Sequence, residues 1–123
     1  MTSLRLLLTG VILELTVATA LIHFSLGGTL FALNGAGYLG LGTAYLVATV
    51  APMPAVRRLA WLPRVALAAF ASVTIVAYLA TGLYFTLGWV TKGIELAIVG
   101  LVIADLLLGA DAGVARRRPP TSA

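Results

Sequence analysis

The chain has 123 residues, of which 61% are apolar and only 10% are charged, and its formal net charge is +4. Soluble domains carry about 25% charged residues, so a chain of this composition cannot cover its own surface with polar groups, and lipid must surround much of it. Its lack of cysteine excludes disulfides, zinc–thiolate sites and thiol nucleophiles, and its basic residues, which gather at predicted helix ends without interleaved aromatics, argue against nucleic-acid binding.

Four apolar segments approach the length of about 20 residues that a helix needs to cross a bilayer. They predict an all-α integral membrane protein with spans at 4–26, 29–50, 62–85 and 92–108. Gly27 and Gly28 separate the first two spans, because glycine is a poor helix former and a good turn residue. Pro52 and Pro54 end the second span.

The last two spans have weaker boundary signals. Pro63 suits the first turn of the third span, while Thr91 is a candidate N-cap and Gly109 a candidate stop for the fourth. We therefore predict one transmembrane domain over 1–110. The Arg- and Pro-rich tail over 111–123 is expected to be disordered and cytoplasmic.

The basic residues predict how the spans are oriented. Seven arginines lie before the first span, between the second and third, or after the fourth: Arg5, Arg57, Arg58, Arg64, Arg116, Arg117 and Arg118. Only Lys92 falls on the other side. The positive-inside rule then places both termini in the cytoplasm, in the cell membrane. The short connections predict an up-down-up-down four-helix bundle.

A competing interpretation concerns the first span. Arg5, the apolar stretch after it and the run 18–20 (Ala-Thr-Ala) resemble a cleaved signal peptide, whose loss would leave three spans. Against cleavage, Glu14 interrupts the apolar region, and the apolar run continues beyond the cleavage site. We therefore retain four spans.

The second span carries small residues at every fourth position, which lets a neighbouring backbone approach closely. These residues are Ala36, Gly40, Ala44 and Ala48. We expect this ladder to pack against the first or third span, and a dimer interface is the alternative.

Polar side chains inside hydrocarbon are costly, so those within predicted spans are candidates for handling a ligand or a proton. With a helical rise of about 1.5 Å per residue, one group falls near the outer ends of the spans. This group contains His23, Asn34, Tyr84 and Glu95. Glu14 and Asp105 lie deeper, roughly 18–20 Å from the outer edge by the same rise.

Two interpretations of the outer group stay open. In the structural one, His23 hydrogen-bonds Glu95, while Asn34 and Tyr84 complete a network that fixes helix register. In the functional one, these residues line a small polar cavity where His23 and Glu95 carry a proton or hold a polar ligand.

Helix phase restricts the deeper residues. Glu14 and His23 are about 180° apart around an ideal helix, so only one of them can face the bundle interior, and the other faces a partner or a second copy. Glu14 and Asp105, if close together, could not both ionise cheaply. We therefore predict that at least one of them is protonated at neutral pH.

No motif for an enzyme, a metal site or a nucleotide site is present, and we predict neither metal nor cofactor. The leading hypothesis is a non-enzymatic accessory or assembly subunit whose partner is a larger membrane protein or a second copy. One alternative is an oligomeric proton-coupled transporter or channel. A second is a redox subunit that shares haem or quinone with a partner through His23.

The segments 31–39 (FALNGAGYL) and 86–95 (TLGWVTKGIE) resemble small four-span membrane proteins of bacteria and archaea that have no established activity. The resemblance implies a four-helix membrane fold and carries no functional residue over. Glu14 also invites comparison with small multidrug transporters, which use a glutamate in their first span. The other spans here do not follow that family's pattern.

Overall fold

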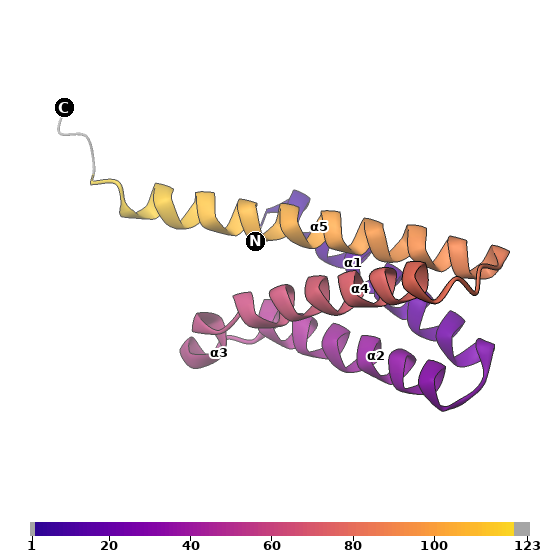
Figure 1. Cartoon of the computed structure of the whole chain (residues 1–123). Helices are drawn as coiled ribbons and strands as arrows, with labels where there is room; N and C mark the ends of the chain where they lie inside the picture. Colours follow the sequence, from indigo (N-terminus) through magenta and orange to yellow (C-terminus); the bar gives the residue numbers. More distant parts are fainter. Residues whose placement is uncertain (1, 120–123) are drawn as a thin grey trace.

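The computed structural model describes residues 2–119, and within them all regular structure is helical (Figure 1). The elements are α1 (Ser3–Leu26), α2 (Thr29–Val50), α3 (Pro54–Arg58), α4 (Trp61–Thr81) and α5 (Thr86–Arg117). Four of them, α1, α2, α4 and α5, are long and apolar enough to cross a membrane. The prediction of an all-α chain with four such helices is confirmed.

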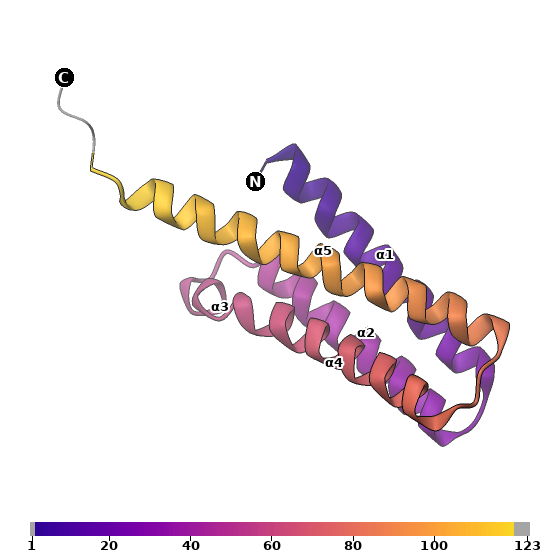
Figure 2. The same ribbon diagram turned by 45° about the horizontal axis from the view of Figure 1, so that its top comes forward.

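The four long helices form a ring in which each has two main neighbours. α1 packs against α2 and α5, and α4 packs against the same two helices. The interface between α2 and α4 is the least extensive of the four. α5 extends past the ends of the other helices, as its yellow end shows in Figures 1 and 2.

Glycines end two of the helices as their conformational freedom predicts. Gly27 and Gly28 have φ angles of 75° and 86°, which a residue with a Cβ rarely adopts, and they separate α1 from α2 as expected. Gly82 caps α4 in the left-handed conformation with φ 68°. α4 therefore ends at Thr81, before the predicted boundary at residue 85.

The fourth long helix differs from prediction at both ends. α5 begins at Thr86 with Phe85 as its N-cap, so Thr91 is a helical residue and not the cap. It continues to Arg117, well past the predicted end at Leu108 and into the tail expected to be disordered. Glycine inside a helix costs only about 1 kcal/mol relative to alanine, so Gly109 does not stop it. The rest of that tail, 120–123, lies outside the described residues.

The connection between α2 and α4 contains a helix that the sequence analysis did not predict. α3 has five residues and begins with Pro54 at its first position. Proline is favoured there because its fixed φ suits a helix and its missing N–H has no intrahelical partner. This turn carries Arg57 and Arg58 at one end of the bundle.

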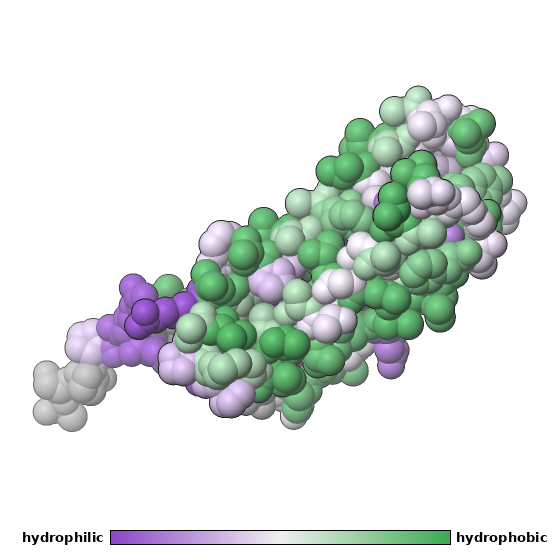
Figure 3. All heavy atoms as spheres, turned by 90° about the horizontal axis from the view of Figure 1, so that it is seen from below, coloured by the Kyte–Doolittle hydropathy of each residue, from purple (hydrophilic) through white to green (hydrophobic). Residues whose placement is uncertain are grey.

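Large apolar side chains cover the outer surface of the bundle. Leu7, Leu33, Val76 and Leu96 are each more than half exposed. Figure 3 shows apolar residues over most of one face, with polar residues gathered at the end where α5 projects. The centre is filled chiefly by Tyr38, Tyr45, Ile12, Leu67, Ile98 and Val102, which are fully buried.

Most of the small residues at every fourth position of α2 do not pack against another span. Ala36, Gly40 and Ala44 are exposed on the outside of the bundle, and only Ala48 is buried. The expectation of packing against another span is therefore wrong for three of the four positions. The buried face of α2 instead carries the two core tyrosines, seven residues apart, and that larger apolar area decides which side turns inward.

Two other glycines allow α1 and α2 to approach closely. A Cβ at Gly35 would lie 2.9 Å from Cζ of Phe24 and 3.0 Å from the carbonyl oxygen of Ala20. A Cβ at Gly42 would lie 3.0 Å from Cγ2 of Thr16. A side chain at Gly35 would press on the backbone of α1, and one at Gly42 would require the Thr16 side chain to shift, whereas Gly40 has open space around it.

Candidate functional site

The polar residues of the helices gather in two groups near opposite ends of α1. We call the first the histidine cluster; it consists of Thr19, His23, Lys92 and Glu95. We call the second the arginine cluster; it consists of Arg5, Thr9, Tyr45, Thr49, Arg64 and Asp105. Each cluster joins helices that are distant in sequence through hydrogen bonds or ion pairs.

Glu95 is the centre of the histidine cluster. Its side chain is 0% exposed, and its Oε2 accepts a contact of 2.5 Å from Nζ of Lys92, one turn earlier in α5. Its Oε1 lies 3.7 Å from Nε2 of His23 on α1 and has no hydrogen-bond partner among the described residues. His23 and Glu95 lie close together, but the hydrogen bond expected between them is not formed at 3.7 Å. Because α5 begins six residues earlier than predicted, Glu95 lies in its third turn.

A backbone carbonyl of α1 determines which nitrogen of the His23 ring carries a hydrogen. Nδ1 of His23 lies 2.7 Å from the carbonyl oxygen of Thr19. A carbonyl oxygen can only accept, so Nδ1 carries a hydrogen and donates it. In a neutral ring Nε2 would then turn a lone pair toward Oε1 of Glu95, and two facing lone pairs repel. At 3.7 Å the two atoms form no hydrogen bond, and a hydrogen on either Nε2 or Oε1 would remove this repulsion.

Aromatic contacts hold His23 in this orientation. The ring of Tyr38 lies 5.5 Å from the His23 ring, centroid to centroid. Tyr38 is itself fixed, because its hydroxyl pairs with Oγ1 of Thr74 at 2.9 Å and its ring meets Phe70 edge-on at 4.9 Å. The histidine cluster is thus rigidly supported by α2 and α4.

A cavity of about 620 Å³ lies beside the histidine cluster. His23 and Lys92 line it, so the buried carboxylate of Glu95 is linked to it through both neighbours. The rest of the lining is mainly apolar, with a few polar groups: Leu26, Leu30, Phe31, Asn34, Val73, Thr74, Ala77, Tyr78, Thr81, Leu83, Phe85, Gly88 and Thr91. Volume and lining of this kind are typical of sites for small molecules.

Exposed residues of α2, of α4 and of the connection between α4 and α5 line the cavity. Leu30 is 68% exposed, Val73 is 66% exposed and Leu83 is 74% exposed. The cavity therefore lies at the surface of the bundle and is not enclosed.

Asn34 and Tyr84 were also predicted for this site, and only one of them lies there. Asn34 lines the cavity as expected. Tyr84 does not, because it is 52% exposed, donates to the carbonyl oxygen of Leu79 and packs on Trp89. It belongs to a surface group of aromatics of the kind found at membrane interfaces.

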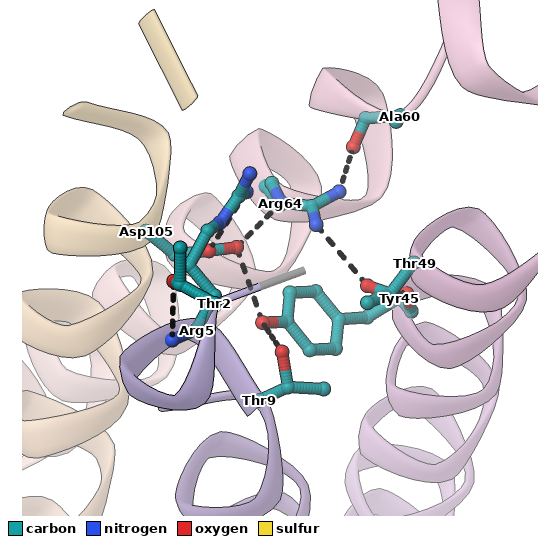
Figure 4. Close-up of polar contacts among 8 residues, drawn as sticks. All are labelled: Thr2, Arg5, Thr9, Tyr45, Thr49, Ala60, Arg64 and Asp105. Carbon is teal, nitrogen blue, oxygen red and sulfur yellow. Dashed lines mark hydrogen bonds and ion pairs between the residues drawn. The ribbon is translucent and has the colours of Figure 1, made fainter. Parts of the chain in front are cut away.

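Asp105 is the centre of the arginine cluster (Figure 4). Its side chain is 1% exposed. Arg64 donates through Nε to Oδ2 at 2.6 Å, and Arg5 donates through Nη2 to Oδ1 at 3.2 Å. The hydroxyl of Tyr45 also donates to Oδ2, at 3.1 Å. One carboxylate of α5 thus binds donors from α1, α2 and α4.

Arg64 has further partners that fix its side chain. Its Nη2 donates to Oγ1 of Thr49 at 3.1 Å, and its guanidinium lies 4.9 Å from the centre of the Tyr45 ring. From the sequence, Arg64 was counted only among the charges that determine orientation. Its position near the start of the third predicted span could have indicated a carboxylate partner, since a buried arginine requires one.

Glu14 and Asp105 were predicted not to ionise together if they lay close to each other, and this condition is not met. Asp105 is bound instead by two guanidinium groups, from Arg5 and Arg64, which stabilise its charged form. Glu14 is exposed on the outside of the bundle near the middle of α1. In the part of the chain that the structure describes, no hydrogen bond or ion pair engages it. Of Glu14 and His23, His23 is therefore the one that faces inward.

Neither cluster has the composition of a metal site. Within residues 2–119, no group of three His, Asp or Glu side chains is placed to hold a metal ion. Comparisons with protein-family models, with curated proteins and with solved structures found no match. The chemistry of the clusters is therefore the basis for assigning a function.

Proposed function

We propose that this chain is a multi-pass protein of the cell membrane, with its long helices in up-down-up-down order and both termini in the cytoplasm. Seven arginines lie at or beyond the helix ends at one side of the bundle. Because α5 begins at Thr86, Lys92 lies inside a helix, and the connections at 27–28 and 82–85 carry no charge. Seven arginines against one lysine is the charge difference that favours this orientation.

Within this membrane protein, the cavity beside His23 binds a small apolar molecule that carries a hydrogen-bonding oxygen. Its apolar walls match the body of such a molecule, and Lys92, Asn34 and Thr91 offer polar contacts to the oxygen. The observation that carries this proposal is the buried pair of His23 and Glu95 next to the cavity, with Nε2 and Oε1 3.7 Å apart and no hydrogen-bond partner for Oε1 among the described residues. Two ionisable side chains at this depth provide a path for a proton beside the bound molecule, so the protein acts as a proton-coupled carrier.

The geometry of His23 disfavours the haem alternative. Nδ1 donates to Thr19, and Nε2 faces the Glu95 carboxylate. Neither nitrogen is free to coordinate a haem iron. A ligand held by polar contacts and apolar walls agrees better with this arrangement.

Photolabelling tests the cavity. Benzophenone is a small apolar ketone that bonds to nearby C–H groups on illumination. With the protein in lipid nanodiscs, we expect labelling to concentrate on cavity residues such as Phe31 and Val73. Ala77→Trp places a large side chain in the cavity and should reduce this labelling about tenfold, which corresponds to about 1.4 kcal/mol of binding free energy. The matched control Val76→Trp, on the lipid-facing side at 65% exposure, should leave it unchanged.

Equal labelling of Ala77→Trp and the native protein would contradict the cavity as a binding site. The carrier step is tested separately in vesicles that enclose a pH-sensitive dye. An imposed pH gradient should drive proton movement through the native protein, and Glu95→Gln should abolish it. Proton movement that persists in Glu95→Gln would contradict coupling while leaving ligand binding intact.

A second candidate function is that of a subunit in a larger membrane assembly, and the exposed Glu14 favours it. A carboxyl group near the bilayer centre costs at least a few kcal/mol unless it is protonated or covered. A protonated carboxyl both donates and accepts, so Glu14 can pair with Glu14 of a second copy across a twofold axis. The outward ladder of α2 is available to the same assembly but does not identify its partner.

Native mass spectrometry from nanodiscs tests this assembly. We expect a dimer that Glu14→Gln retains, because an amide also donates and accepts, and that Glu14→Leu loses. Val17→Leu changes a neighbouring exposed side chain of α1 and should have no effect. A chain that stays monomeric with native Glu14 would exclude the homodimer.

A further inference from the structure

We propose that a second cavity, next to the arginine cluster, binds a phosphate group, as carried by the headgroup of an anionic phospholipid. The cavity has a volume of about 530 Å³ and lies among α1, α2, α3, α4 and α5. Arg5, Arg57, Arg64 and Asp105 are its charged lining residues. The inference rests on the membrane placement proposed above and is independent of the ligand of the histidine cluster.

Charge favours an anion in this cavity. Three guanidinium groups and one carboxylate line it, which leaves a formal charge of +2 (3 − 1). Both oxygens of Asp105 are already engaged, Oδ1 by Arg5 and Oδ2 by Arg64 and Tyr45. The carboxylate therefore has little further capacity to neutralise the third arginine.

Two of the arginines keep donors for a ligand. Arg64 uses Nε, Nη1 and Nη2 for Asp105, Ala60 and Thr49. Arg5 donates to Asp105 through Nη2 alone, and its side chain remains 29% exposed. The exposed Arg57 makes no side-chain hydrogen bond within residues 2–119. The planar fork of a guanidinium matches two phosphate oxygens, so Arg5 and Arg57 form a suitable pair.

The remaining lining fits a molecule with an apolar part. Trp61, Leu106 and Ala48 contribute apolar surface beside the arginines. Trp61 is 54% exposed at the start of α4, where an interfacial tryptophan is expected. Basic cavities between transmembrane helices on the cytoplasmic side are typical sites for anionic headgroups. The cavity thus combines a phosphate-binding pair, Arg5 and Arg57, with an apolar wall for the glycerol and acyl region.

Arg57 and Arg58 provide a matched pair of variants. They are adjacent and both exposed, but only Arg57 lines the cavity. Neither contributes to the Asp105 network, so substitution of either should leave the fold intact. Native mass spectrometry of the full chain with phosphatidylglycerol should show binding weakened about fivefold by Arg57→Gln, the effect of one surface arginine. Arg58→Gln should match the native protein.

The same measurement distinguishes the source of the phosphate. Phosphatidylcholine, whose headgroup has no net charge, should bind more weakly than phosphatidylglycerol. Competition by inorganic phosphate that Arg57→Gln removes would show that the cavity also accepts soluble phosphate; lack of competition, with lipid binding retained, would assign it to the headgroup. Equal effects of the two substitutions, or equal binding of the two lipids, would overturn the proposal.

Discussion

His23 is the only histidine in the chain, so its protonation can be followed without assignment. Nitrogen-15 NMR of histidine-labelled protein should show Nδ1 protonated at neutral pH, because Nδ1 donates to the Thr19 carbonyl oxygen. In Glu95→Gln the new amide can donate to Nε2, so the ring should be neutral with a bare Nε2. Asp111→Asn, which changes an exposed acid of α5, should leave the native spectrum.

A neutral ring with its hydrogen on Nε2 and none on Nδ1 would contradict this arrangement. It would mean that the contact with Thr19 does not fix the ring. Two proton-accepting atoms, Nε2 and Oε1, would then no longer face each other, and the carrier proposal would lose its main support.

The contribution of the arginine cluster to the stability of the fold depends on Asp105. Asp105→Asn leaves Arg64 buried without a countercharge, and breaking a buried pair in this way costs about 3–5 kcal/mol. We expect a correspondingly lower free energy of unfolding, measured by titration of detergent-solubilised protein with SDS. Asp111→Asn removes an exposed acid and should change it by no more than about 0.5 kcal/mol. Equal stability of the two variants would show that Asp105 is not structurally important.

At the scale of the helices, close packing of α1 on α2 depends on Gly35. Gly35→Ala would push a Cβ against the Ala20 carbonyl oxygen, which belongs to the backbone and cannot move aside cheaply. We expect this variant to be destabilised by about 1–3 kcal/mol. Gly40→Ala, on the open side of the same helix, should be stabilised by about 0.5–1 kcal/mol, because alanine favours the helix. SDS unfolding of both variants measures the difference.

The opposite order of stability would mean that the outward ladder, and not Gly35, makes the close helix contact. Ala36 and Ala44 would then have to lie against a neighbouring helix. The same measurement therefore tests the rotation of α2 about its own axis.

The sequence predicted the existence of these helices better than their rotation. Hydropathy and the glycines at 27 and 28 gave the first two spans correctly. Spacing in steps of four suggested the wrong face of α2, because a ladder of small residues does not say which neighbour it meets. The charge on Lys92 suggested a span boundary, whereas Lys92 is an internal residue paired with Glu95.

The candidate site shows the same limit. The helical rise placed His23 and Glu95 at similar depth, which predicted their approach. The partners of Asp105 could not be predicted in this way, since they depend on which helices are neighbours in the ring and which side each turns inward. An estimate of depth does not say which helices are neighbours or how each helix is rotated.

For the whole molecule, the proposed orientation makes a direct prediction about access. The chain has no cysteine, so single-cysteine variants can be labelled cleanly. Leu83→Cys lies in the connection between α4 and α5, and Met53→Cys lies next to α3; both positions are more than half exposed. On intact cells, a membrane-impermeant maleimide should label the first variant, and the second only after permeabilisation. Labelling of both on intact cells would contradict the topology.

The length of α5 has a practical consequence for imaging this small protein. Its 32 residues span about 48 Å at 1.5 Å per residue, whereas the hydrocarbon core is about 30 Å thick. In the proposed membrane placement, the last turns of α5 would stand clear of the lipid as a stiff rod. A soluble domain spliced in register onto this rod would keep a fixed angle to the bundle, and so provide a fiducial for single-particle cryo-electron microscopy.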